Sequence, residues 1–300
     1  MNKRKTINVF FSVDENYIIH FTVALTSLLE NNKDLDTFVY ILYDKSYREK
    51  LEQAESFFNR QYGVKLNLIA IDKDIFKNVP ISDYISKASY YRLLLADLIP
   101  ENVDYGLYLD CDTIVTGSLS EFANPVSLPG SLKDDNYFLA VPDKGEETDI
   151  KRLKKIGLDI DGYFNAGVMF IHLKKWRIDN VSDKLLLTMQ EYESHLKWHD
   201  QDVLNIYFKN KWGKLNDTYN KFVDKRLSEL PKIIHFSGSS KPWHYLNYHP
   251  YKSIYWKYLN LTPFKNEKFE AVTVRKVIEK YRGKLKRSVA LLSPKEELHY

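Results

Sequence analysis

Residues 105–113 decide the fold, and they are Tyr-Gly-Leu-Tyr-Leu-Asp-Cys-Asp-Thr. The apolar run 105–109 predicts a short buried strand that ends at Asp110 and Asp112. Open α/β folds bind ligands at the carboxyl ends of their strands, and residues two apart in an extended segment project to the same side. Alternatively, such an Asp-x-Asp pair only marks a turn or caps a helix. Paired carboxylates repel without a cation, so Asp110 and Asp112 are candidate ligands of Mg²⁺ or Mn²⁺.

The rest of the chain alternates apolar runs with amphipathic segments, which predicts strands joined by helices in a mostly parallel sheet. Before residue 105, the predicted strands are 7–13, 37–43 and 64–71, and the predicted helices are 18–29, 46–62 and 90–98. After it, the predicted strands are 137–141, 167–173 and 233–234, and the predicted helices are 180–196 and 201–208. No internal repeat or low-complexity linker interrupts this pattern, so the fold class is α/β.

The composition is that of a globular chain, with 300 residues of which 44% are hydrophobic. The 44 basic and 40 acidic residues give a net charge of +4, which implies neither nucleic acid nor an acidic partner. The only cysteine, Cys111, excludes an intramolecular disulfide and predicts a reducing compartment. The apolar run near the N-terminus is too short for a signal peptide, and no run of about 18 apolar residues predicts a membrane span. We therefore expect a soluble, cytoplasmic protein.

Positive charge gathers near the C-terminus. Between Lys265 and Arg287 there are nine basic residues and three glutamates, a net charge of +6. Apolar and cationic residues recur there at loosely helical spacing, which fits a helix lying on anionic lipid, although Gly283 weakens a continuous helix. A solvated helix, or one packed on the domain or on a second subunit, is the alternative. Nucleic-acid binding is not expected, because no nucleic-acid motif accompanies the charge.

Six sequence blocks occur in an order typical of one enzyme family. They are Phe11–Tyr17, Tyr90–Leu93, Tyr108–Thr113, Tyr163–Val168, His199–Asn205 and His235–Trp243. Through these blocks, residues 6–250 resemble the bacterial lipopolysaccharide α-galactosyl- and glucosyltransferases of glycosyltransferase family 8, relatives of glycogenin. The resemblance implies a GT-A fold, with a Rossmann-like, mostly parallel central sheet flanked by helices. The expected domains are a GT-A catalytic domain of residues 1–250 and a basic helical tail of residues 251–300.

The resemblance also implies a donor and a metal. A UDP-hexose would lie across the carboxyl ends of the strands, held through Mn²⁺ or, as an alternative, Mg²⁺. His235 would complete the metal site with Asp110 and Asp112, and an imidazole among carboxylates favours Mn²⁺. Without the resemblance, a lone histidine after a short apolar strand is more often a core residue.

Further donor contacts follow from the same resemblance. Asp14 and Asn16 would contact the uracil and ribose; either could instead, or at the same time, cap the helix that begins nearby. Gly238 and Lys241 would contact the diphosphate from a small-residue loop, which could otherwise be a surface turn. The remaining implied donor contacts are Tyr17, Arg92, Asp110, Cys111, Asn165 and Ala166.

Two residues of the His199–Asn205 block are the candidates for catalysis. The resemblance implies that Gln201 lies nearest the anomeric carbon of the donor sugar. An amide is a poor nucleophile, so front-face attack with retention is expected rather than double displacement. Asp200 would bind sugar hydroxyls and help stabilise positive charge, and it could also cap the helix at 201–208. The expected acceptor is a hydroxyl of a glycan, a glycolipid or a glycoprotein.

Other activities are compatible with the same residues. A glycogenin-like enzyme that glucosylates itself and a nucleotide-sugar-binding protein without turnover are the main alternatives. A metal-dependent phosphohydrolase or nucleotidyltransferase would use Asp-x-Asp but has no need of Asn165 and Gln201. The sequence does not separate a galactose donor from a glucose donor, since these sugars differ at one hydroxyl.

Overall fold

The computed structural model describes residues 4–76, 87–125, 128, 132, 136–223, 225–269, 274, 277, 278 and 281. Within them, seven strands form one sheet in the order β3-β2-β1-β4-β7-β6-β8. These strands are β1 (Lys5–Ser12), β2 (Leu35–Asp44), β3 (Leu66–Ile71), β4 (Tyr105–Leu109), β6 (Phe138–Pro142), β7 (Phe164–His172) and β8 (Gly213–Lys214). Only β7 among them runs antiparallel to its neighbours, so the predicted mostly parallel sheet is confirmed.

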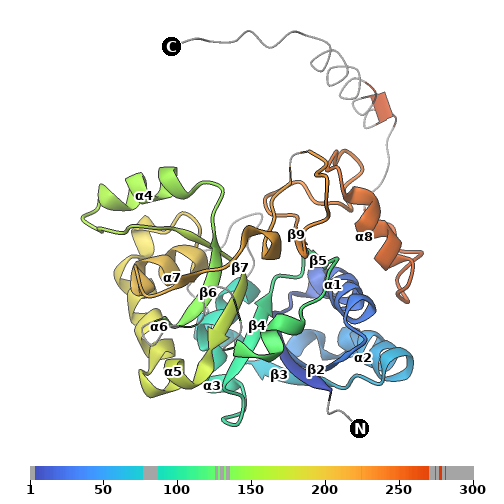
Figure 1. The fold of residues 1–300 in the computed structure, drawn as a ribbon, viewed down its shortest axis with the longest axis horizontal. Helices are drawn as coiled ribbons and strands as arrows, with labels where there is room; N and C mark the ends of the chain where they lie inside the picture. Colours follow the sequence, from blue (N-terminus) through green and yellow to red (C-terminus); the bar gives the residue numbers. More distant parts are fainter. Residues whose placement is uncertain are drawn as a thin grey trace.

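Helices cover both faces of this sheet. The α-helices are α1 (Ile18–Asn31), α2 (Arg48–Tyr62), α3 (Leu95–Leu98), α4 (Glu146–Lys154), α5 (Leu173–Ile178), α6 (Val181–Glu191), α7 (Asp200–Phe208) and α8 (Lys252–Leu259). Phe11 belongs to the core between the sheet and α1, α2 and α8, whereas its neighbour Phe10 belongs to the core on the side of α3, α5, α6 and α7. Figure 1 shows α1 and α2 on the side of β2 and β3, and α5, α6 and α7 on the side of β6 and β7. Alternate residues of the strands thus fill two cores, as period-two side chains require.

Short 3₁₀ segments connect several of these elements. They are Glu15–Tyr17, Lys45–Tyr47, Lys73–Phe76, Lys87–Leu94, Ser120–Ala123, Glu193–His195 and Asp217–Tyr219. Residues 90–98 are helical as predicted, but the residues up to Leu94 wind as 3₁₀ and only α3 is α-helical. Six of the eight side chains in Lys87–Leu94 are buried, so contacts with the surrounding core, and not one amphipathic face, set its winding.

A second, two-stranded sheet joins distant parts of the sequence. In it β5 (Thr113–Val115) pairs antiparallel with β9 (Ile233–His235), and Thr113 lies opposite His235. The backbone N–H of Phe236 donates to the carbonyl of Asp112 at 3.0 Å. The sequence predicts β9 but not its partner. The pairing places the end of the Asp-Cys-Asp segment beside His235.

The first part of the predicted tail packs against α1. The Nδ1 atom of His20 lies 2.8 Å from the Tyr255 hydroxyl on α8, and the amide of Asn31 donates to the Tyr258 hydroxyl at 2.7 Å. The His20 ring also stacks on Trp243, with 3.4 Å between ring centroids. Residues 251–259 are therefore attached to the sheet through α1.

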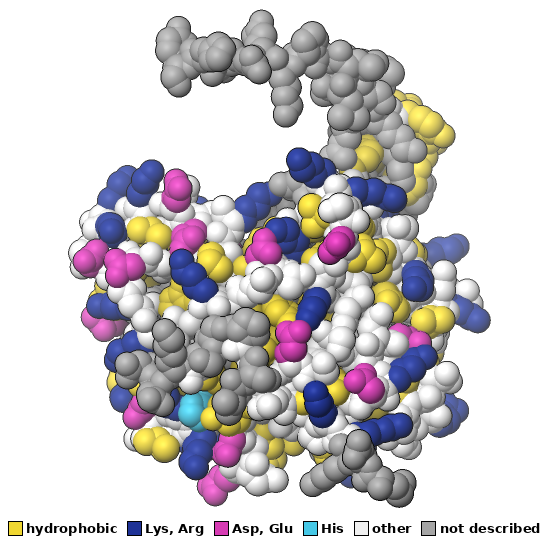
Figure 2. Space-filling view, in the orientation of Figure 1, with side chains coloured by type: hydrophobic (Ala, Val, Ile, Leu, Met, Phe, Trp, Pro, Cys, Tyr) yellow, Lys and Arg dark blue, Asp and Glu magenta, His cyan; other side chains and the backbone are white. Residues whose placement is uncertain are grey.

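Most of the basic segment lies outside the described residues, and its helical and membrane-facing character stays a prediction. Within the described part of the chain, no helix is both long enough and apolar enough to cross a bilayer. Figure 2 shows basic and acidic side chains interspersed over the described part of one face, in keeping with the nearly balanced totals of 44 and 40.

We predict that His20 makes folding stability depend on pH. Burial lowers the pKa of His20 from 6.5 to about 3, opposed by the Asp112 carboxylate and reinforced by Lys241 and His244. Between these two values the unfolded chain binds a proton that the folded chain does not. Stability therefore falls as the pH drops through this range, by up to about 1.4 kcal/mol per pH unit.

Urea unfolding at about pH 7 and about pH 5 measures this dependence. The substitution His20→Gln removes the titrating group and is expected to flatten the pH dependence. The matched substitution His195→Gln, at an exposed histidine, should leave it unchanged. The prediction would be contradicted if the free energy of unfolding changed equally with pH in the wild type and in His20→Gln.

Candidate active site

A cavity of about 600 Å³ opens at the carboxyl ends of β1 and β4. All the predicted site residues except Asn16 line it. They are Asp14, Tyr17, Arg92, Asp110, Cys111, Asp112, Asn165, Ala166, Asp200, Gln201, His235, Gly238 and Lys241. The strand-end rule thus placed the site, and folding brings together residues that lie far apart in the sequence.

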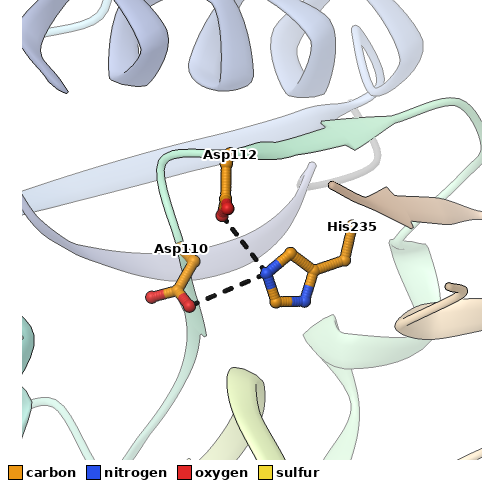
Figure 3. Close-up of side chains that lie close together, drawn as sticks. All are labelled: Asp110, Asp112 and His235. Carbon is orange, nitrogen blue, oxygen red and sulfur yellow. Dashed lines mark ion pairs between the residues drawn. The ribbon is translucent and has the colours of Figure 1, made fainter. Parts of the chain in front are cut away.

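Two carboxylates and an imidazole converge on one side of this cavity. The Nε2 atom of His235 lies 3.2 Å from Oδ1 of Asp112 and 3.8 Å from Oδ2 of Asp110. One ligand atom from each residue lies within 4.8 Å of the other two. Figure 3 shows both carboxylates and the Nε2 edge of the ring turned toward one another. Two carboxylate oxygens and an imidazole nitrogen form a donor set that fits Mn²⁺ better than Mg²⁺.

The opposite sides of the carboxylates are held by cations. Arg92 and the Tyr108 hydroxyl donate to Oδ1 of Asp110 at 2.8 and 3.1 Å, which leaves Oδ2 facing His235. The Lys241 ammonium contacts Oδ2 of Asp112 and donates to the carbonyl of Phe236 at 3.0 Å. Burial raises the pKa of Asp112, but Lys241 and His235 outweigh that effect and hold it well below its usual range. Both aspartates are thus held in position with one oxygen toward the histidine.

A buried ion pair links this cluster to Asp200. Arg92 lies 3.0 Å from Oδ2 of Asp200 and donates to the carbonyl of Ala166 at 2.7 Å. Burial raises the pKa of Asp200 to about 6, although Arg92 opposes the shift. His199, not Asp200, occupies the N-cap position of α7. The carboxylate of Asp200 is therefore directed to Arg92 at the cavity wall and does not serve as the helix cap.

The amide of Gln201 is fixed on the same wall. Its Oε1 accepts from the backbone N–H of Ala166 and from Nδ2 of Asn165, each at 3.1 Å. Nδ2 of Asn165 also donates to Oδ2 of Asp143 at 3.0 Å. Asp143, which lines the cavity directly after β6, was not predicted, although the strand-end rule that identified Asp110 could have found it.

The turn before Gln201 is strained and is held by a buried aspartate. His199 adopts φ 49° and ψ −120°, a conformation that costs a non-glycine residue about 1–3 kcal/mol. Asp202 accepts from the backbone N–H groups of Lys197 and Trp198 at 2.7 and 2.9 Å. Asp202 is fully buried, and it fixes the segment that presents Gln201 to the cavity.

The Glu15–Tyr17 turn and the Gly238–Lys241 loop also contribute residues to the cavity lining. Asp14 caps the turn by accepting from the backbone N–H of Asn16 at 2.9 Å, so its capping alternative is realised. The Tyr17 ring meets Trp243 edge-on, with 5.8 Å between centroids. Gly238 has φ 86°, a backbone conformation that favours glycine.

The mostly parallel sheet with its site at the strand ends is the arrangement found in GT-A glycosyltransferases. The solved structure of the galactosyltransferase LgtC with donor and acceptor sugar analogues has the same fold, with a TM-score of 0.75 and 25% identity, covering 93% of this chain and all of that one. The chain belongs to glycosyl transferase family 8, whose model matches residues 8–247. The family indicated by the six sequence blocks is thereby confirmed.

Curated relatives agree with this family. The lipopolysaccharide 1,2-glucosyltransferase of Escherichia coli is 32% identical over 264 residues, covering 81% of this chain and 75% of that protein. General stress protein A of Bacillus subtilis (strain 168) is 28% identical over 280 residues, covering 85% of this chain and 93% of that protein.

We predict that Gly167→Ala disrupts the Asp–Asp–His cluster. A Cβ atom at Gly167 would lie 2.3 Å from Cε1 of His235 and 2.8 Å from Oδ2 of Asp110, so both side chains must move. The affinity for Mn²⁺, measured by titration calorimetry, is expected to fall at least about tenfold. The control is Gly145→Ala, whose Cβ would make only ordinary contacts. An unchanged Mn²⁺ affinity in Gly167→Ala would refute the assignment.

Proposed function

We propose that this protein is a retaining hexosyltransferase that moves galactose or glucose from a UDP-sugar to a hydroxyl of a surface glycan or glycolipid. The observation that carries the proposal is the Asp110, Asp112 and His235 cluster, which shares one cavity with Lys241 and Gln201. The names of the relatives, a lipopolysaccharide glucosyltransferase and a galactosyltransferase, support a hexose donor and a glycan acceptor. We further propose that transfer takes place in the cytoplasm, with the basic tail contacting the membrane surface.

The donor would lie with its diphosphate between the metal ligands and the Gly238–Lys241 loop. A Mn²⁺ ion held by Asp110, Asp112 and His235 would act as a Lewis acid toward the leaving diphosphate. The Lys241 ammonium, already beside Asp112, would place a second positive charge where negative charge develops. Tyr17 and the Asp14 turn, which also line the cavity, would contact the nucleoside.

The cavity wall favours front-face chemistry over a covalent intermediate. The group proposed to lie beneath the sugar is the amide of Gln201, whose oxygen already accepts two hydrogen bonds. Arg92 pairs with Asp200, which would bind sugar hydroxyls and offset positive charge on the ring without attacking it. The acceptor oxygen would bond to the anomeric carbon on the face from which the phosphate oxygen leaves, and its proton would pass to that oxygen. This route retains the configuration without a protein nucleophile.

We predict that one UDP-hexose releases UDP slowly in the presence of Mn²⁺ and not with EDTA. Asp112→Asn should reduce the release at least about 100-fold, because it removes a charged ligand at the leaving group. UDP release is measured over a panel that includes UDP-galactose and UDP-glucose. The control is Asp183→Asn, at an exposed carboxylate of α6. Intact mass after incubation distinguishes transfer to water or acceptor from glycosylation of the protein itself.

Two outcomes would contradict the proposal. Release that is equally fast with EDTA would exclude metal assistance, and Mn²⁺-dependent binding of UDP without transfer to any lipid-linked or free glycan would indicate a binding protein. Loss of activity in Asp183→Asn as well would show that the effect of Asp112→Asn is not specific to the site.

A further inference from the structure

A buried asparagine that is not among the predicted site residues connects His235 to Asn165. Asn220, which is 1% exposed, follows the Asp217–Tyr219 segment and lies between His235 and Asn165. Its Nδ2 donates to Oδ1 of Asn165 at 2.9 Å, and its Oδ1 lies 2.9 Å from Nδ1 of His235. The orientations of these amides follow from their neighbours.

The orientation of the Asn165 side-chain amide is determined by a backbone donor. The backbone N–H of Gly167 can only donate, and it meets the side chain of Asn165 at 3.0 Å, so the atom it meets is Oδ1. The opposite atom, Nδ2, then faces the carboxylate of Asp143 and Oε1 of Gln201, both of which are acceptors. The backbone N–H of Ala166 confirms that Oε1 is the oxygen of Gln201. Two backbone N–H groups therefore determine the orientations of both amides.

The orientation of Asn165 determines the amide orientation of Asn220 and the nitrogen of His235 that carries a proton. Oδ1 of Asn165 can only accept, so the atom of Asn220 that meets it is Nδ2. The other atom of Asn220, Oδ1, can only accept, and it lies at hydrogen-bonding distance from Nδ1 of His235. Nδ1 of His235 must then carry a proton, and Nε2 is the ring nitrogen turned toward Asp110 and Asp112.

We propose that Asn220 is a positioning residue that keeps a proton on Nδ1 of His235 and presents Nε2 to the paired carboxylates. Its own orientation is set from the backbone N–H of Gly167 through Asn165. The opposite amide orientation would set Oδ1 of Asn220 against Oδ1 of Asn165, two acceptors in a buried place, which is costly.

This role, which rests on the proposed function where it concerns metal binding, gives the site a shared orienting network. A histidine that donates from one nitrogen to an oxygen acceptor is oriented to bind a metal through the other. Asn165 serves both halves of the network, because it orients Asn220 on one side and Gln201 on the other. The metal ligand and the amide proposed to lie beneath the sugar are thus held by one chain of hydrogen bonds.

Two substitutions separate positioning from a purely structural role. Asn220→Ala removes the acceptor for Nδ1–H, whereas Asn220→Asp keeps an acceptor there but cannot donate to Asn165. We expect Mn²⁺ affinity to fall about 10–100-fold in Asn220→Ala and to recover at least about tenfold in Asn220→Asp. The control is Asn32→Ala, at an asparagine that is also 1% exposed, follows α1, and bonds the backbone groups of Leu28 and Leu119 through its amide. Melting temperatures of all three variants report the structural cost.

A nitrogen-15 NMR spectrum of the metal-free wild type tests the same inference without a metal. It should show a proton on Nδ1 of His235 that exchanges slowly, and Asn220→Ala should lose this protection. A wild-type His235 protonated on Nε2 alone would overturn the inference, as would equal losses of Mn²⁺ affinity in Asn220→Ala, Asn220→Asp and Asn32→Ala. A wild type that binds no Mn²⁺ but shows the Nδ1 proton would contradict the metal part of the proposed function and leave Asn220 as the group that orients His235.

Discussion

The antiparallel pairing of β5 with β9 is the interaction on which the site depends. It sets Thr113 opposite His235 and bonds the Phe236 N–H to the Asp112 carbonyl. A second contact, from the backbone N–H of Asp110 to the carbonyl of Gly167 at 2.8 Å, ties the same segment to β7. The two contacts hold both ends of the Asp-Cys-Asp turn, so the spacing of the carboxylates and the imidazole is set by the backbone. Such positioning on strands is more exact than positioning on a free loop.

Charge compensation is the second constraint. Burying an aspartate is costly unless it is paired and hydrogen-bonded, and the half-buried Asp110 and the buried Asp112 and Asp200 each have a cationic partner. Arg92 serves both Asp110 and Asp200, and Lys241 serves Asp112. These cations also fix which carboxylate oxygens remain free to face His235. The site is therefore organised before a donor arrives, which is the property that electrostatic catalysis requires.

The pattern of apolar residues along the sequence predicts the sheet well, because strands buried on both faces give continuous apolar runs, as in β1, β2 and β4. The strand-end rule also locates Asp110 and Asp112, whose position follows from the strand before them. It does not identify β5 as the partner of β9, because that pairing joins segments distant in sequence. Asn220 acts through hydrogen bonds that exist only after folding, so no spacing in the sequence points to it. Gly238, Lys241 and Gln201 were identified through the family resemblance, and in the structure all three line the cavity.

The central claim is that Asp110, Asp112 and His235 bind one cation at which the diphosphate of the donor also lies. Anomalous X-ray diffraction from crystals grown with Mn²⁺ and UDP tests it directly. The account predicts a single strong manganese peak in contact with Oδ2 of Asp110, Oδ1 of Asp112, Nε2 of His235 and the diphosphate, with Lys241 against the phosphate oxygens. Manganese bound elsewhere, or UDP in the cavity without manganese at these three side chains, would contradict it.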